Sequence, residues 1–423
     1  MKEVKAAIIT IGDELLIGQT IDTNSAFIAQ ELNKLGIWVS RRIAVGDVKE
    51  EILECLEKES SRCDLLIITG GLGPTADDIT KPALCEYFNA SLVVDAMALE
   101  NVHRIFTRLN KPVSERNRMQ AEVPDNCRVL QNARGTAPGM WFEKNGVVYV
   151  SLPGVPNEMK GLLTDAVVPA LQKHFQLSAI VHRTALLAGK GESEVAELLF
   201  GFESSLPPHV KLAYLPAFGM LRLRLTARGE DRQLLEAETE RLFADMNEQV
   251  RDYLVATEDT SLQQVVIELL KASGKKLAIA ESCTGGYIAH LITSIAGSSA
   301  VFNGGVVAYA NEVKEAVLNV PAATLQQFGA VSEQTVGAMA RGVLEQLGAD
   351  YAVATSGIMG PGGGSLEKPV GLVWIAVAGR SAARAFQINY PFDRNRNIQY
   401  TATTALNLLR RFIVEQEAQQ KWD

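Results

Sequence analysis

The sequence contains little histidine and little cysteine, with five residues of each among 423. None of the cysteines forms a C-x-x-C pair, and their odd number does not suggest a disulfide framework. The sequence also lacks H-E-x-x-H and any Cys/His cluster with the spacing of a zinc site. These absences argue against zinc-dependent hydrolysis, disulfide exchange and a secreted disulfide-rich scaffold.

Positive charge is also in short supply. Lys and Arg total 41 against 49 Asp and Glu, which gives a formal charge of −8. Because nucleic-acid binding depends mostly on Lys and Arg at phosphates, we expect no direct nucleic-acid partner. No apolar run approaches the roughly 18 residues of a membrane helix, and the run before Gly12 is too short for a signal peptide. We therefore expect a cytoplasmic protein without a membrane partner.

The length and a hydrophobic content of 47% are sufficient for about three packed domains. Strand and helix patterns alternate in the N-terminal and C-terminal parts of the chain. The shorter segment between them reads as a small α+β unit without a catalytic constellation. The predicted fold class is α/β, with two three-layer α/β domains joined by an α+β connector. The predicted domain boundaries are 1–172, 173–256 and 257–423.

The first domain begins with a β-α-β-α-β order. Continuous apolar runs predict buried strands over Val4–Ile11 and Asp64–Thr69, with another strand over Trp38–Val45 between them. This order predicts a parallel, doubly wound sheet, in which ligands bind at the carboxyl ends of the strands. Gly12-Asp13-Glu14 and the glycine-rich loop after Thr69 both lie at such ends.

These loops carry residues that suit a phosphate or nucleotide site with a divalent metal. Glycine-rich backbone approaches phosphate closely, and carboxylate oxygens suit Mg²⁺. The phosphate-binding candidates are Gly70, Gly71, Gly73 and Thr75, and the metal candidates are Asp13, Glu14, Asp77 and Asp78. The structural alternative is that the glycines are turn residues and that Thr75 with Asp78 forms a capping box. Pro82 disfavours helical geometry at Lys81, so the helix is also compatible with a start at Thr80.

The last domain places Glu281-Ser282-Cys283-Thr284-Gly285-Gly286 where a predicted strand turns into a helix. A nucleophile at such a turn is exposed, and helix N–H groups lie near it. Ser282 is the candidate nucleophile, while Cys283 is an alternative nucleophile or a small packing residue. No histidine is positioned to act as its base, since His290 only follows on the helix. A lysine with a lowered pKa is the remaining base, and Lys314 is one of many lysines that the spacing leaves open.

The N-terminal motifs resemble those of a known family. GDELL (residues 12–16), TGGLGPTADDIT (69–80), GTAPG (135–139) and LPGVPNEM (152–159) are similar to the molybdopterin-binding-like domain of the competence/damage-inducible protein A family, CinA. The resemblance covers about residues 4–170. It implies an ADP-ribose pyrophosphatase that uses a divalent metal, Mg²⁺ or Co²⁺, and adds Gly135 and Thr136 to the substrate-binding candidates.

The C-terminal motifs resemble the amidohydrolase domain of the same family over about residues 260–415. The matching segments are AESCTGG (280–286), residues 296–318, GAVSE (329–333) and SGIMGPGGGSLEKPVGLVW (356–374). The resemblance implies deamidation of nicotinamide mononucleotide by a Ser/Lys mechanism that needs no cofactor. It implies Ser282 as nucleophile, Lys314 as general base and Tyr309 as a proton-relay or positioning group. The implied substrate-binding residues are Thr284, Gly285, Gly286, Ser356, Gly357, Gly360 and Gly363.

The sequence departs from the family pattern at four positions. Met359 stands where Ala is expected, Gly362 where Asp is frequent, and Leu372 where Thr is usual; Phe392 precedes Asp393-Arg394 where Gly is common. Met359 and Gly362 lie in the implied binding loop, so the departures concern substrate affinity. Ser282 and Lys314 are intact.

The resemblance as a whole implies a bifunctional hydrolase of pyridine-nucleotide salvage, and a homodimer. Its implied small-molecule partners are nicotinamide mononucleotide and ADP-ribose. One alternative is a deamidase whose N-terminal domain binds a nucleotide or pterin without catalysis. Another is a competence-associated regulatory protein.

Overall fold

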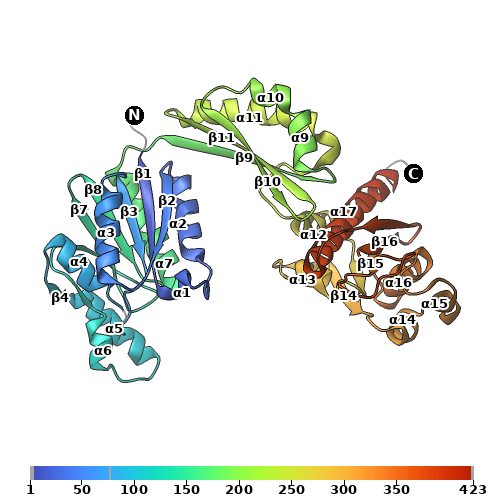
Figure 1. Ribbon diagram of the computed structural model, residues 1–423, viewed down its shortest axis with the longest axis horizontal. Coiled ribbons are helices and arrows are strands. Elements are labelled where there is room, and N and C mark those ends of the chain that lie inside the picture. Colours follow the sequence, from blue (N-terminus) through green and yellow to red (C-terminus); the bar gives the residue numbers. More distant parts are fainter. Residues whose placement is uncertain (1–3, 76–77, 421–423) are drawn as a thin grey trace. The chain divides into compact units, whose positions relative to one another are not determined.

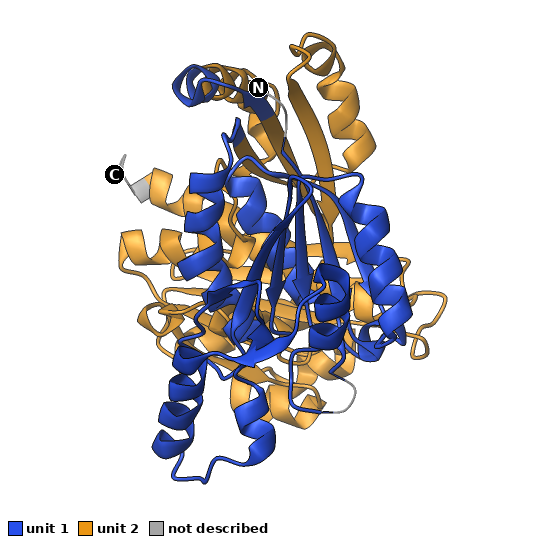
Figure 2. Ribbon diagram, turned by 90° about the vertical axis from the view of Figure 1, so that its left-hand side faces the viewer, with its two compact units in different colours: residues 1–181, 227–237 blue, residues 182–226, 238–423 orange. Residues whose placement is uncertain are grey.

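A computed structural model describes residues 4–75 and 78–420 of the chain (Figure 1). The residues group into two compact units, which are residues 1–181 with 227–237, and residues 182–226 with 238–423 (Figure 2). The boundary between the units passes through strands β9 (Ala179–Ala188) and β11 (Met220–Gly229) and helix α11 (Arg232–Gln249). The predicted fold class is confirmed: the chain is a mixed α/β protein with several sheets.

The first unit contains a six-stranded sheet in the order β2-β1-β3-β8-β7-β6. Its strands are β1 (Lys5–Ile11), β2 (Trp38–Val45), β3 (Leu65–Thr69), β6 (Arg128–Leu130), β7 (Gly139–Lys144) and β8 (Val147–Leu152). Strands β2, β1, β3 and β8 are parallel, which confirms the predicted doubly wound arrangement. The antiparallel extension through β7 and β6 was not predicted.

Helices cover both faces of this sheet, because its central strands are apolar on both sides. One face packs against α2 (Thr23–Lys34), α7 (Pro156–Leu162), a π-turn (Leu163–Val167) and α8 (Val168–His174). The other face packs against α3 (Lys49–Ser60) and α4 (Thr80–Phe88). Helix α4 begins at Thr80, which is the start that Pro82 favoured over one nearer Thr75. The remaining elements are α1 (Asp13–Leu16), β4 (Leu92–Val94), α5 (Ala96–Arg108), α6 (Glu115–Met119) and β5 (Glu122–Pro124).

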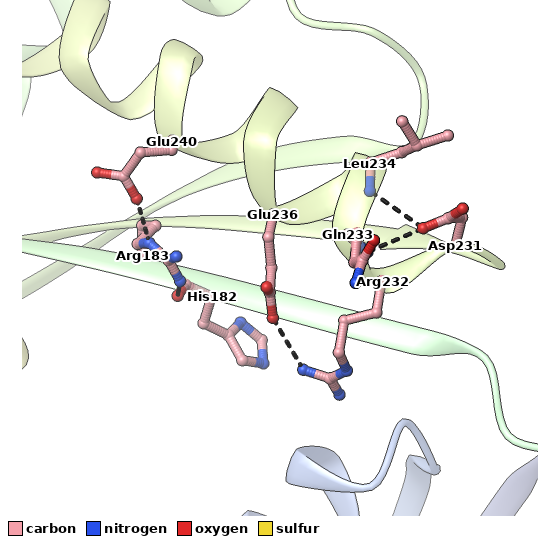
Figure 3. Close-up of polar contacts among 8 residues, drawn as sticks. All are labelled: His182, Arg183, Asp231, Arg232, Gln233, Leu234, Glu236 and Glu240. Atoms are coloured by element: carbon pink, nitrogen blue, oxygen red, sulfur yellow. Dashed lines mark hydrogen bonds and ion pairs between the residues drawn. The ribbon is translucent and has the colours of Figure 1, made fainter.

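The middle of the chain forms a four-stranded sheet in the order β10-β11-β9-β12 with three helices. Its further elements are α9 (Glu192–Leu198), α10 (Phe200–Ser204), β10 (Val210–Ala217) and β12 (Leu254–Ala256). Helix α11 begins after Asp231, whose carboxylate accepts the N–H groups of Gln233 and Leu234 (Figure 3). The Arg183 guanidinium on β9 pairs with Glu240 of the same helix at 2.7 Å (Figure 3).

The C-terminal part contains a five-stranded sheet in the order β14-β13-β15-β16-β17. Its strands are β13 (Leu277–Glu281), β14 (Phe302–Val307), β15 (Tyr351–Gly357), β16 (Leu372–Gly379) and β17 (Ala383–Asn389). One face packs against α12 (Leu262–Ser273), α13 (Tyr287–Thr293) and α17 (Arg394–Gln420), and the other against α14 (Asn311–Leu318), α15 (Ala322–Phe328) and α16 (Glu333–Gln346). The N-cap of α12 is Ser261, whose hydroxyl oxygen accepts the N–H of Gln264.

Candidate functional site

A buried carboxylate organises the turn that carries Ser282. Strand β13 ends at Glu281, which is 1% exposed, and the Ser282 N–H donates to the Thr355 carbonyl of β15 at 3.0 Å. The Glu281 carboxylate accepts N–H groups from Gly286, Ile288 and Ala289 at 3.0, 3.1 and 2.8 Å. These bonds satisfy N–H groups at the start of α13, which a helix leaves open. The predicted strand–turn–helix is therefore present, and it holds Ser282 at the carboxyl edge of the sheet.

The N–H groups of Gly285 and Gly286 are engaged within the turn. Gly285 donates to the Ser282 carbonyl at 3.2 Å, and Gly286 donates to Glu281. Contrary to the expectation for these two glycines, neither N–H is free to donate to a substrate. The Thr284 hydroxyl lies 2.8 Å from that of Thr355 and is buried. Among the N–H groups of this turn, those of Cys283 and Thr284 donate to no backbone carbonyl within the described residues.

Lys314 is almost completely buried, with 1% of its surface exposed, on the first turn of α14. Its ammonium nitrogen donates to the carbonyl oxygens of Ala308 and Tyr309 at 2.8 and 3.0 Å. Burial lowers the pKa of Lys314, because the charged form is poorly solvated there; Cys283 and Glu312 oppose this shift. The spacing alone did not select this lysine, whereas its burial together with its place in the pocket that Ser282 lines does.

The three predicted catalytic side chains meet at one pocket of about 200 Å³. Its lining residues are Ser282, Cys283, Tyr309, Lys314, Ala330, Val331, Ser356, Gly357, Met359 and Arg394. Tyr309 follows β14 and is 63% exposed, so its ring stands at the mouth of the pocket rather than in its floor. Residues from five parts of the chain thus share one cavity.

Arg394 is a site residue that the sequence did not identify. It begins α17, and its guanidinium donates to the Gly360 carbonyl at 2.9 Å and to the Tyr309 hydroxyl at 3.3 Å. Arg394 and Tyr309 are 85 residues apart, so no local pattern connects them. The signal in the sequence was its place in the Asp393-Arg394 pair of the family pattern, to which no role was assigned. It supplies a cation at the mouth of the pocket.

The Ser356 segment forms the pocket wall. The Ser356 hydroxyl donates to the Ala330 carbonyl at 2.7 Å, and a Cβ at Gly357 would lie 2.8 Å from the Leu372 carbonyl oxygen. Gly360 and Gly363 lie in the following loop with φ of +82° and +86°, outside the lining of the pocket. The Lys368 ammonium ties this loop to the Phe328 and Val331 carbonyls at 2.8 and 2.9 Å.

Met359 and Gly362, two departures from the family pattern, differ in how they affect the pocket. Met359 is 3% exposed and lines the pocket, so it changes the shape of the binding surface directly. A Cβ at Gly362 would meet no atom within 4 Å, so packing does not require glycine there. Cys283 also lines the pocket, but burial raises the pKa of its thiol to about 12. Its thiolate form is therefore scarce at neutral pH, which disfavours it as the nucleophile.

In the first unit, three predicted loops meet at the carboxyl edge of the sheet. Gly70 has φ +116°, and a Cβ there would lie 2.1 Å from the Ile11 carbonyl oxygen at the end of β1. A Cβ at Gly154 would lie 3.3 Å from the Gly70 Cα. The loops after β1, β3 and β8 are therefore packed backbone to backbone, and only glycine allows this approach.

Asp78 holds the shape of the glycine-rich loop. Its carboxylate accepts the Gly73 N–H at 2.7 Å, the Thr75 N–H at 2.9 Å and the Thr75 hydroxyl. This is one half of the capping-box alternative, but the helix itself begins later, at Thr80. A Cβ at Gly71 would lie 2.2 Å from the Thr80 hydroxyl oxygen. The Asp78 and Thr80 side chains thus fix the conformation of the loop.

The predicted metal ligands do not form one cluster in the described chain. Asp13 and Asp47 exchange hydrogen bonds, N–H to carboxylate in both directions, at 3.0 and 3.1 Å. The Glu14 carboxylate lies over Gly12, where a Cβ would be 2.6 Å from it. Asp77 lies outside the described residues. Among residues 4–75 and 78–420, no group of three or more His, Cys, Asp or Glu is placed to hold a metal.

Glu158, in the LPGVPNEM motif, is like Arg394 a site residue to which the sequence analysis gave no role. Its carboxylate accepts from the Asn132 amide at 2.7 Å, and a Cβ at Gly135 would lie 1.8 Å from its Cδ. Burial raises the pKa of Glu158, while the Asn132 hydrogen bond opposes this. The Asn101 amide donates to the Gly135 carbonyl at 2.8 Å. The Gly135–Thr136 loop is therefore fixed beside a half-buried carboxylate.

The family comparisons match three parts of the chain. Residues 7–173 match the family described as "Probable molybdopterin binding domain", residues 182–256 match "Damage-inducible protein CinA KH domain", and residues 259–413 match "CinA C-terminal domain". Within the described residues, none of the helices is long and apolar enough to cross a bilayer.

Curated relatives match nearly the whole chain. A CinA-like protein of Cytophaga hutchinsonii is 47% identical over 412 residues, which are 97% of this chain and 99% of the relative. A putative competence-damage inducible protein of Caldicellulosiruptor bescii is 39% identical over 97% of this chain and 99% of the relative. A crystal structure of competence/damage inducible protein CihA from Agrobacterium tumefaciens is 45% identical, covers 35% of this chain and 91% of its own, and has a TM-score of 0.35. With such identity over its full length, the chain belongs to the CinA family.

Proposed function

We propose that the C-terminal domain deamidates nicotinamide mononucleotide to nicotinate mononucleotide and ammonia. The observation that carries the proposal is the pocket that Ser282, Lys314 and Tyr309 line together, with Lys314 buried and its pKa lowered. A hydrolase of this kind needs a nucleophile, a base and a cation for the substrate phosphate. The pocket offers Ser282, Lys314 and Arg394 for these three roles.

The hydrogen bonds of Lys314 are compatible with a base in the neutral form. A neutral amine has two N–H donors and one lone pair, whereas an ammonium has three donors and none. The carbonyls of Ala308 and Tyr309 accept two donors, which leaves the lone pair of the neutral amine for a third direction. Because burial already favours the neutral amine, Lys314 is suited to accept a proton from Ser282.

The proposed reaction balances with Ser282, Lys314 and one water molecule. Lys314 accepts the hydroxyl proton of Ser282 while Oγ attacks the carboxamide carbon. The tetrahedral intermediate breaks its C–N bond, and the proton on Lys314 passes to the leaving nitrogen as ammonia forms. A water molecule then gives a proton to the same lysine as its oxygen attacks the acyl carbon. The C–Oγ bond breaks, Lys314 returns the proton to Ser282 Oγ, and nicotinate mononucleotide is released. The N–H groups of Cys283 and Thr284 are the available donors for the developing oxyanion.

The test is ammonia release from nicotinamide mononucleotide by the full chain. Ser282→Ala should lower the rate by about a thousandfold or more, since removal of a nucleophile leaves only residual catalysis. Ser273→Ala is a matched control, because Ser273 donates only to carbonyls of its own helix. A Ser282→Ala protein that releases ammonia at the wild-type rate would overturn the assignment.

The N-terminal domain is proposed to hydrolyse ADP-ribose to AMP and ribose 5-phosphate with a divalent metal, Mg²⁺ or Co²⁺. The packed glycine loops at the sheet edge support a diphosphate site. Mg²⁺ is often held by one or two carboxylates together with substrate phosphates, and the exposed Asp13 and Glu14 side chains fit this mode without a larger cluster. The metal would neutralise diphosphate charge, while Gly71 and Gly73 bring backbone close to the phosphates.

A specific observation also favours the alternative of a non-catalytic nucleotide- or pterin-binding domain. The Asp78 carboxylate accepts hydrogen bonds from Gly73 and Thr75 with both of its oxygens. Incubation of the full chain with ADP-ribose and Mg²⁺ or Co²⁺, with and without a chelator, separates the two functions. Metal-dependent AMP release supports the hydrolase, and saturable binding without AMP release supports the binding domain. A cytoplasmic homodimer is the proposed state of the protein.

A further inference from the structure

The second unit contains another pocket, of about 680 Å³, which is separate from the one that contains Ser282. Three segments form it: the loop 189–192 after β9, the β10–β11 hairpin tip (residues 216–221) and one side of α17 with Tyr390. Its volume lies within the roughly 300–1,000 Å³ that is usual for small-molecule sites. The proposed deamidation leaves this pocket unused.

Aromatic side chains form one wall of the pocket. Tyr400 stacks on Phe392 with ring centres 4.8 Å apart, and Tyr390 lies 5.7 Å from Tyr400. Phe218 at the hairpin tip meets Tyr400 edge-on at 6.1 Å and is 45% exposed. A Cβ at Gly219 would lie 3.5 Å from the Tyr400 ring, so the hairpin tip packs directly on α17. The cluster fixes the wall and leaves part of Phe218 open for a planar ring to stack.

The charges in the pocket favour an anion with a single phosphate. The Arg396 guanidinium lies 4.4 Å from the centre of the Phe392 ring. Within the described part of the chain it forms no ion pair and no side-chain hydrogen bond. Lys190, the other cation of the lining, is already paired with Glu194 at 2.9 Å. One unpaired, preoriented guanidinium matches one phosphate, which it binds through two parallel hydrogen bonds.

The remaining polar groups suit a sugar. Glu192 lines the pocket, and a carboxylate accepts hydrogen bonds from ribose hydroxyls. Thr403 and Thr404 add hydroxyls from α17, and Thr404 is held by the Tyr390 hydroxyl at 2.6 Å. A planar ring, an acceptor for hydroxyls and a single free cation together describe a nucleoside monophosphate.

We propose that this pocket is a binding site for a nucleoside monophosphate, with its base against Phe218, its ribose near Glu192 and its phosphate on Arg396. The site is distinct from the deamidase pocket and does not depend on the proposed reactions. It lies on the same helix as Arg394, two positions further along the chain. A ligand held by Arg396 therefore touches the helix that begins at the mouth of the pocket of Ser282.

The test uses photolabelling of the full chain with 8-azido-AMP, followed by peptide mass spectrometry. We expect label on peptides that contain residues 216–221 or 390–407, and we expect AMP to remove it. Inorganic phosphate and adenosine, each lacking half of the ligand, should compete at least tenfold more weakly. Label confined to other peptides, or label that AMP does not remove, would overturn the proposal. The peptide assignment keeps this result separate from any AMP bound by the N-terminal domain.

Two variants and a control test the assigned contacts. Arg396→Gln should weaken AMP competition at these peptides by about tenfold or more, as the loss of a charge-assisted hydrogen bond predicts. Phe218→Ala, at an exposed hairpin tip, should weaken it several-fold. Arg241→Gln, an exposed arginine of α11 outside the pocket, should change nothing. Unchanged labelling in Arg396→Gln would refute the site, and thermal melts verify that each variant is folded.

Discussion

Single side chains of this protein titrate in ways that their surroundings determine, and Lys314 is the main example. As a base it works only when neutral, so deamidation should fall as the pH drops through its lowered pKa. The charge of Glu312 raises the pKa of Lys314. Glu312→Gln should therefore move the acidic limb of the kcat/KM profile to lower pH, and more so at low salt.

The matched control for this pH shift is Glu315→Gln on the same helix, since Glu315 is exposed and is not among the groups that shift Lys314. Initial rates of ammonia release across pH 6 to 10, in about ten steps, measure both profiles. A limb that moves equally in the two variants, or toward higher pH in Glu312→Gln, would contradict Lys314 as the base.

Lys81 is a buried lysine outside the proposed reactions, and its nitrogen donates to the Gln120 carbonyl at 3.0 Å. Burial lowers its pKa from 10.5 to about 8. Between these values the folded chain binds fewer protons than the unfolded chain, so the free energy of unfolding should rise with pH. The Lys81→Met variant has no titrating group at this position, so its free energy of unfolding lacks this increase with pH. The difference in urea midpoint, wild type minus variant, should increase from below pH 8 toward pH 10; a constant difference would contradict the buried charge.

At the scale of elements, glycines decide how closely the loops at the N-terminal site approach. Gly70→Ala would place a Cβ 2.1 Å from the Ile11 carbonyl oxygen at φ +116°. It should cost about 3 kcal/mol or more and lower AMP release. Gly146→Ala, at φ +78° with no atom within 4 Å, is the control and should cost only about 1 kcal/mol. Equal losses in the two variants, measured by urea unfolding, would show that the close approach is unimportant.

The elements also show which features a sequence can reveal. Trp38–Val45 was predicted with its observed ends, although this strand is largely exposed and is not a continuous apolar run. DLLIIT gave a strand over Leu65–Thr69, because buried parallel strands read as continuous apolar runs. The antiparallel hairpin of β7 and β8 was missed, although Asn145-Gly146 is a strong turn signal. Strand order across a sheet depends on packing that no local pattern contains.

The site residues also divide into those that a local motif predicts and those that depend on contacts distant in sequence. The turn that carries Ser282 is local, so its motif predicted it. Arg394 and Glu158 become site residues only through contacts with Tyr309 and Gly135, which are distant in sequence. The engagement of the Gly286 N–H by Glu281 was likewise hidden, since it required the side-chain direction of a buried carboxylate.

At the scale of the whole molecule, the two proposed reactions use residues of different units. Asp78 belongs to the first unit, and Ser282 and Lys314 belong to the second. We expect Ser282→Ala to abolish ammonia release while AMP release from ADP-ribose is unchanged. Asp78→Asn should lower AMP release about tenfold or more, because it loosens the glycine loop through lost charge-assisted bonds, with ammonia release unchanged. Parallel loss of both activities in either variant would contradict separate sites.

Acid quenching during the first turnovers with nicotinamide mononucleotide tests whether Ser282 forms the covalent intermediate. Fragmentation of the labelled peptide distinguishes Ser282 from its neighbour Cys283, whose raised pKa argues against attack. We expect a nicotinate mononucleotide adduct on Ser282 that disappears in Ser282→Ala and persists in Cys283→Ala. An adduct on Cys283, or undiminished ammonia release by Ser282→Ala, would contradict it.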